Sequence, residues 1–142
     1  MTIEIRAATP SDSAAVLALW LEAETHPTAT DDLGSVNGLL AHDPGSLLVA
    51  EDGSTLVGSV IAGWDGWRGS IYRLAVSPSA RRRGVAGALV REAERRLVVL
   101  GARRLQAAVV SDDPQAIAFW RSSGWEEQDN RKRFVRSDAP GG

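Results

Sequence analysis

The segment from Leu74 to Leu89 constrains the fold of this chain more than any other part of it. An apolar stretch, a Ser-Pro turn, three arginines and two glycines follow one another there, and an amphipathic pattern begins at the first glycine. This order predicts a buried strand, a tight turn and the N-terminus of a helix.

The same segment predicts an anion site. The unpaired N–H groups of a helix N-terminus and its partial positive charge bind phosphate. Gly84 and Gly87 remove side chains that would keep a pyrophosphate away, and Arg81, Arg82 and Arg83 add positive charge at the rim. The alternative is a helix start on a basic surface. Glycine inside a helix costs up to about 1 kcal/mol relative to alanine, and the segment accepts that cost twice, so we favour the phosphate site.

Composition excludes several classes of protein. The 142 residues suit one domain over residues 1–136 with a disordered tail over 137–142. The chain has no cysteine and only two histidines, His26 and His42, so we expect neither a metal nor a cysteinyl intermediate. A net charge of -2 argues against nucleic acid as a partner. Neither a membrane span nor a secretory signal is expected, which makes the cytoplasm the predicted location.

Hydrophobic periodicity predicts alternating helices and strands. A helix begins at Thr9 and Pro10, and a weaker helix covers Asp32 to Ala41. The turn at Asp52 and Gly53 joins two strands. The remaining expected elements are strands over Ile3–Ala7, Leu47–Glu51, Leu56–Trp64, Ile71–Ser77 and Leu105–Val110, a long helix ending near Gly101, a helix over Pro114–Ser123 and a last hairpin from Gly124 to Val135. Their order predicts a mixed α/β fold.

Three segments resemble the GCN5-related N-acetyltransferases (GNATs). Arg81, Gly84 and Ala86 match that family's acetyl-coenzyme A signature. The hairpin from Leu47 to Val60 and the segment from Asp113 to Trp125 follow in the family's order. The resemblance implies a GNAT fold: four helices around a mixed, mostly antiparallel sheet of about seven strands, splayed between the fourth and fifth. It also implies transfer of acetyl from acetyl-coenzyme A directly to an amine, without a metal.

The resemblance also implies which residues bind the coenzyme. It assigns the pantetheine to the strand around Val76 and the oxyanion donor to the backbone N–H of that residue. The pyrophosphate falls on the turn and helix that follow. The implied cofactor-binding residues are Leu74, Ala75, Val76, Arg81, Arg82, Arg83, Gly84, Val85, Ala86, Gly87, Ala88, Asp113, Ala116, Phe119 and Trp120.

The sequence departs from the family at the position of the general acid. Trp120 stands where the family has a tyrosine acid, and an indole cannot donate a proton at neutral pH. This departure keeps a second hypothesis open, a non-catalytic module that senses acyl-coenzyme A. Strand alternation predicts that Tyr72 shares a face with Leu74 and Val76, where it acts in catalysis or makes a cross-strand contact. Glu22 is a candidate base, with a solvated surface glutamate as the alternative.

The acceptor is expected to be a small-molecule amine or a peptide. Trp64 and Trp67 are candidates for the walls of its pocket through cation–π contact, and Asp65 for holding a cationic amine. The alternatives are hairpin packing for the tryptophans and turn formation for the aspartate. Burial of this tryptophan-rich turn also predicts a homodimer.

Overall fold

A computed structural model describes residues 2–23, 27–109 and 113–136 of the protein. The chain divides into two compact units, Met1–Ala107 and Ala108–Gly142, which are described separately. The predicted tail, 137–142, lies outside the described residues, as does His26.

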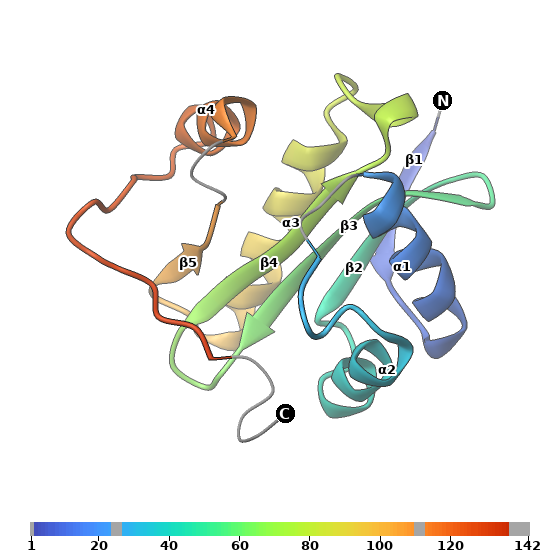
Figure 1. Ribbon diagram of the computed structural model, residues 1–142, viewed down its shortest axis with the longest axis horizontal. Helices are drawn as coiled ribbons and strands as arrows, with labels where there is room; N and C mark the ends of the chain where they lie inside the picture. Colours follow the sequence, from blue (N-terminus) through green and yellow to red (C-terminus); the bar gives the residue numbers. More distant parts are fainter. Residues whose placement is uncertain (1, 24–26, 110–112, 137–142) are drawn as a thin grey trace. The chain divides into compact units, whose positions relative to one another are not determined.

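The first unit is built on a five-stranded sheet in the order β1-β2-β3-β4-β5 (Figure 1). The first four strands pair antiparallel, and β5 joins β4 in parallel. The strands are β1 (Ile3–Ala7), β2 (Leu47–Asp52), β3 (Thr55–Trp64), β4 (Gly69–Val76) and β5 (Leu105–Ala107).

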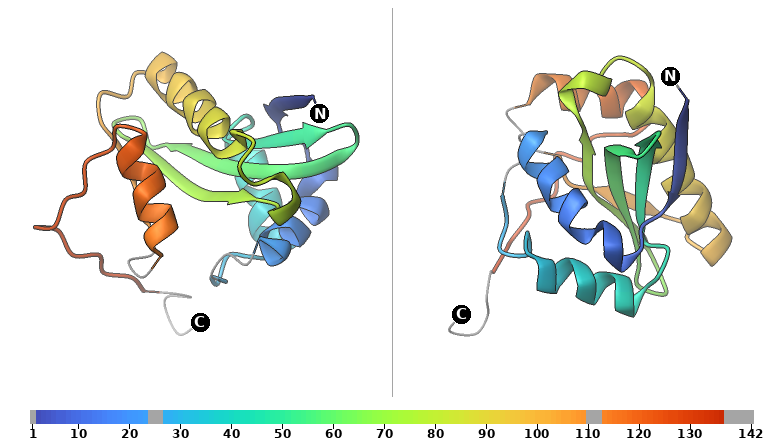
Figure 2. Two further views of the ribbon diagram at one scale, coloured as in Figure 1. Left: turned by 90° about the horizontal axis from the view of Figure 1, so that it is seen from above. Right: turned by 90° about the vertical axis from the view of Figure 1, so that its right-hand side faces the viewer.

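Helices cover both faces of this sheet. Figure 2 shows α1 (Ser13–Glu22) and α2 (Leu33–His42) on one face and α3 (Val85–Leu100) on the other. Gly58 of β3 lies so close to α3 that a Cβ there would be 2.9 Å from Leu89, whereas the hydroxyl of the next residue, Ser59, accepts a hydrogen bond from Trp20 of α1 at 2.9 Å. Successive residues of β3 therefore face opposite layers, one packed against α3 and the other against α1.

Local sequence signals explain where several elements begin and end. The carboxylate of Asp32 caps α2 by accepting the N–H of Ser35 at 2.7 Å. Gly101 ends α3 in the left-handed conformation with φ 115°. Thr9 and Pro10 open a short 3-10 turn, Pro10–Asp12, rather than α1 itself, which follows at once. The predicted hairpin at Asp52 is confirmed.

The second unit contains α4 (Pro114–Ser122). Asp113 caps this helix by accepting the N–H of Ala116 at 3.1 Å. The ring of Trp120 makes edge-on contacts with Phe119 and Trp125, at centroid distances of 5.5 and 4.8 Å. In the described parts of both units, no helix is long and apolar enough to cross a membrane.

The expected sheet of about seven strands is wrong, since the described residues form five strands. The predicted hairpin from Gly124 to Val135 is the missing pair: residues 123–136 contain no strand. Residues 126–133 are all polar or charged, and the apolar pair that follows, Phe134 and Val135, is 92% and 67% exposed. A hairpin there would bury too little apolar surface to be stable.

Candidate active site

A β-bulge in β4 organises the site. Tyr72 pairs with Ile61 and Ala75 pairs with Ser59, so two residues of β4 lie opposite the single residue between them on β3. The first of the two bulged residues, Arg73, has φ 51°, a left-handed conformation that is uncommon for a residue with a side chain.

The bulge reverses which side chains face each layer. Ala75 packs in the core cluster of α1 and α2, and Ile61, the partner of Tyr72, packs against the same cluster. Tyr72 therefore shares a face with Ala75, three residues away, and not with Leu74 and Val76. The expectation from regular alternation is wrong here, because the extra residue shifts the period by one.

Beyond the bulge, the described residues leave one edge of β4 without a paired strand. β4 pairs with β5 only from Gly69 to Ile71. On the other edge, the N–H of Ser77 donates to the carbonyl of Val57 at 2.8 Å. Because hydrogen-bonded and non-hydrogen-bonded pairs alternate in an antiparallel ladder, Val76 and its partner form a non-hydrogen-bonded pair. The N–H of Val76 thus points away from β3, toward the edge that β5 leaves uncovered.

The turn after β4 leads directly into an anion-binding geometry. A short 3-10 turn, Pro78–Ala80, precedes Arg82 at φ 65° and Gly84 at φ 77°, and α3 begins at Val85. Gly84, the N-cap, has no side chain to satisfy the first N–H groups of the helix, and a Cβ there would meet nothing within 4 Å. Backbone donors at a helix start of this kind fit the phosphates of a coenzyme.

The predicted phosphate arginines do not all have the same surroundings. The guanidinium of Arg81 donates to the carbonyls of Val76, at 3.3 Å, and of Ala23, at 3.2 Å. It therefore ties the turn to the end of α1 as well as carrying charge. Arg82 and Arg83 are exposed at the rim, as the sequence predicts.

The carboxylate of Glu22 lies beside the strand end. The hydroxyl of Ser77, the residue after Val76, donates a hydrogen bond to Glu22 and lies 3.1 Å from the hydroxyl of Ser79. The candidate base is thus placed next to the end of β4. Glu24, the next glutamate in the sequence, lies outside the described residues.

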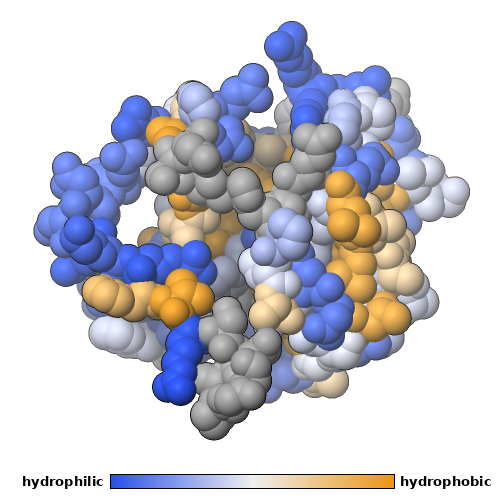
Figure 3. Space-filling view, in the orientation of Figure 1, coloured by the Kyte–Doolittle hydropathy of each residue, from blue (hydrophilic) through white to orange (hydrophobic). Residues whose placement is uncertain are grey.

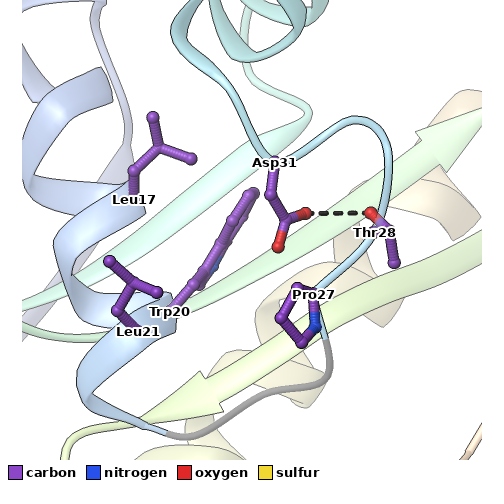
Figure 4. A pocket seen from close by; sticks show the side chains of 6 residues that line it. All are labelled: Leu17, Trp20, Leu21, Pro27, Thr28 and Asp31. Carbon is purple, nitrogen blue, oxygen red and sulfur yellow. Dashed lines mark hydrogen bonds between the residues drawn. The ribbon is translucent and has the colours of Figure 1, made fainter.

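A cavity of ≈ 200 Å³ lies between α1 and the loop that precedes α2 (Figure 4). The described residues that line it are Leu17, Trp20, Leu21, Pro27, Thr28 and Asp31. Beside it, Arg73 of the bulge forms an ion pair with Asp31, and its guanidinium lies 5.0 Å from the centre of the Trp20 ring. These contacts join the loop to β4, and sequence reasoning missed them because their residues are far apart in the chain.

The tryptophan-rich turn between β3 and β4 borders a shallower cavity of ≈ 220 Å³. One oxygen of Asp65 accepts the N–H groups of Trp67 and Arg68 at 2.8 and 2.7 Å, which holds the pKa of this exposed carboxyl below its usual range. Asp65 thus forms the turn. Trp67 is 71% exposed with the guanidinium of Arg68 4.2 Å from its ring centre, and Trp64 lines the cavity.

The comparisons with known proteins agree with this geometry. The model of the acetyltransferase (GNAT) family matches residues 13–125. The chain belongs to the acetyltransferase (GNAT) family. An acetyltransferase of Yersinia enterocolitica is 37% identical over 127 residues, which cover 89% of this chain and 90% of that protein.

Two solved structures show the same fold. The paia N-acetyltransferase of Thermoplasma acidophilum, in complex with coenzyme A, has a TM-score of 0.80 at 17% identity, over 91% of this chain and 92% of its own. AAC(6')-Iy, in complex with the bisubstrate analogue CoA-S-monomethyl-acetylneamine, has a TM-score of 0.77 at 20% identity, over 98% and 100%. The mixed α/β architecture is the GNAT fold.

Proposed function

We propose that the protein transfers the acetyl group of acetyl-coenzyme A to a primary amine of a small molecule or a peptide N-terminus. The observation that carries this proposal is the N–H of Val76 on an open strand edge, followed within one turn by the N-terminus of α3. An acyl donor that carries a thioester and a pyrophosphate needs both features. The N–H of Val76 serves the thioester oxygen, and the helix N-terminus serves the pyrophosphate.

The chain's own groups suggest a role for each part of the site. The N–H groups of Gly84 to Gly87 and the charges of Arg82 and Arg83 bind the phosphates. The backbone around Val76 holds the pantetheine, and its N–H stabilises negative charge on the thioester oxygen. Glu22, through Ser77, accepts the proton that the amine loses.

The transfer balances without a covalent enzyme intermediate. The amine nitrogen forms a C–N bond with the acetyl carbon, the C–S bond breaks, and the released thiolate is protonated. Tyr72 is proposed to line the acceptor side, since its ring is half-exposed on the face of α1. Roles for Asp113, Ala116, Phe119 and Trp120 stay predictions from the family resemblance. The homodimer and the cytoplasmic location stay predictions from the sequence.

Removing one backbone donor tests the central observation. Val76→Pro deletes an N–H that points away from β3, so the ladder keeps its hydrogen bonds. We expect a folded protein whose turnover of acetyl-coenzyme A with amine falls by about 10²–10³-fold, while calorimetry with coenzyme A shows a much smaller change in affinity.

Ala75→Pro is the matched control. Ala75 pairs with Ser59 in the hydrogen-bonded register, so proline at this position removes a hydrogen bond of the ladder. The variant should therefore be less stable than the wild type in unfolding followed by circular dichroism. A folded Val76→Pro protein with full turnover would overturn the assignment of the oxyanion donor. Wild-type protein that binds coenzyme A but releases no thiol with any amine of a broad panel would instead be the non-catalytic sensor.

A further inference from the structure

The cavity beside α1 is walled mainly by apolar groups. Leu17, Trp20 and Leu21 of α1 and Pro27 of the loop make four of the six lining residues that the structure describes, and Figure 4 shows them around one opening. Leu21 is 77% exposed at its edge. Figure 3 shows apolar surface gathered over α1. A group that enters this cavity therefore gains apolar contacts.

Among the described lining residues, the one carboxylate is already neutralised. Asp31 forms an ion pair with Arg73 and accepts the hydroxyl of Thr28 at 2.9 Å. The guanidinium of Arg73 is held in place by the Trp20 ring, so the positive charge cannot leave without breaking both contacts. An ammonium group entering the cavity would meet this cation as well as the carboxylate and would gain no net attraction.

The cavity adjoins the acetyl-transfer site. Trp20, its buried wall, donates to Ser59, and Ser59 pairs with Ala75, the residue before Val76. Glu22, which directly follows Leu21, is bonded to Ser77 on the other side of Val76. An amine placed at Glu22 would have its neighbouring substituent within reach of the cavity.

We infer that this cavity receives an apolar substituent next to the reacting amine, so that the preferred acceptors are monoamines with an apolar side group rather than polycationic amines. This inference rests on the proposed function. The cavity is assigned to the acceptor because Leu21 of its wall directly precedes Glu22, the candidate base, and because the carboxylate of its described lining is already paired.

Three amines of graded chemistry test the inference by thiol release from acetyl-coenzyme A: leucinamide, glycinamide and spermidine. We expect kcat/KM for leucinamide to exceed that for glycinamide by about tenfold, and spermidine to be the poorest. Leu21→Ser should bring the ratio of leucinamide to glycinamide close to one. Val99→Ser is the matched control, since Val99 is 80% exposed on α3, on the opposite face of the sheet, and should leave the ratio unchanged.

Calorimetry with the two amides separates failure of this inference from failure of the proposed function. If no amine releases thiol, the acetyl-transfer proposal fails, but tighter binding of leucinamide that Leu21→Ser abolishes still supports the cavity. A ratio unchanged in Leu21→Ser, or spermidine as the best substrate, overturns the inference. Conversion of a dimer to a monomer by Leu21→Ser in light scattering, with the ratio unchanged, would assign the cavity to a second copy.

Discussion

The contact between Asp31 and Arg73 should be a measurable link between the loop before α2 and the bulge of β4. Both side chains are largely buried, with 17% and 13% of their surface exposed. Arg73 also lies against the Trp20 ring. The proposed perturbation is a double-mutant cycle of Asp31→Asn and Arg73→Met, which removes each charge while keeping similar volume.

The expected magnitudes follow from this partial burial. A pair between the exposed and fully buried limits contributes about 1.5 kcal/mol, and the cation–π contact adds about 1 kcal/mol. Asp31→Asn should therefore lower the free energy of unfolding by about 1.5 kcal/mol and Arg73→Met by about 2.5 kcal/mol. The double variant should lose no more than Arg73→Met alone, because the ion pair can be lost only once, which gives a coupling energy of about 1.5 kcal/mol.

Urea unfolding at neutral pH gives the free energy of unfolding of the wild type and the three variants. In thermal unfolding, each kcal/mol lost should lower Tm by about 3 °C. Additive losses, with a coupling energy below about 0.5 kcal/mol, would refute the argument that the two side chains form one unit. In that case the loop before α2 would owe its position to apolar packing alone.

Two further predictions concern the start of α3 and the ion pair between Arg6 and Asp12. Gly84→Ala should lower the free energy of unfolding by about 1–2 kcal/mol because its φ is +77°, whereas Gly87→Ala should raise it by up to about 1 kcal/mol, since its methyl meets only the end of the Arg91 side chain at 3.2 Å. The reverse order in thermal unfolding would contradict this helix start. Hydrogen bonds from Arg6 lower the pKa of Asp12 from 3.8 to about 2, so they stabilise the fold above pH 4 and that contribution is lost as the pH falls to 2. Asp12→Asn should therefore remove about 1.5 kcal/mol of stability at pH 7 and very little at pH 2; equal losses at both pH values would rule out the ion pair as the cause.

Local signals in the sequence were sufficient for much of the fold. The apolar stretch, turn and glycines between Leu74 and Leu89 predict the end of β4 and the start of α3 because strand, turn and helix chemistry all agree there. The turn at Gly53 and the end of α3 at Gly101 require a positive φ, and a glycine in the sequence indicates such a position.

The bulge and the long-range contacts could not be predicted in the same way. Arg73 adopts a conformation for which arginine gives no sequence signal, so regular alternation misplaced Tyr72. The Glu22–Ser77 hydrogen bond and the Asp31–Arg73 ion pair join residues 55 and 42 positions apart, which only the folded chain brings together. The sequence therefore marked Glu22 as a candidate without indicating its partner.

The reversal of facing in β4 has a consequence for how this strand can vary in length. Before the bulge, Gly69 and Ile71 face α3; after it, Ala75 faces α1. Deleting one of the two bulged residues would leave Tyr72 opposite Ile61 and Ala75 opposite Ser59, so both would keep their layer. Deleting a residue of the strand outside the bulge would instead turn part of the strand to the wrong layer. Insertions and deletions should thus be tolerated at the exposed turn around Gly53 and rejected in β4 outside the bulge, where a single lost residue would do more harm than most substitutions.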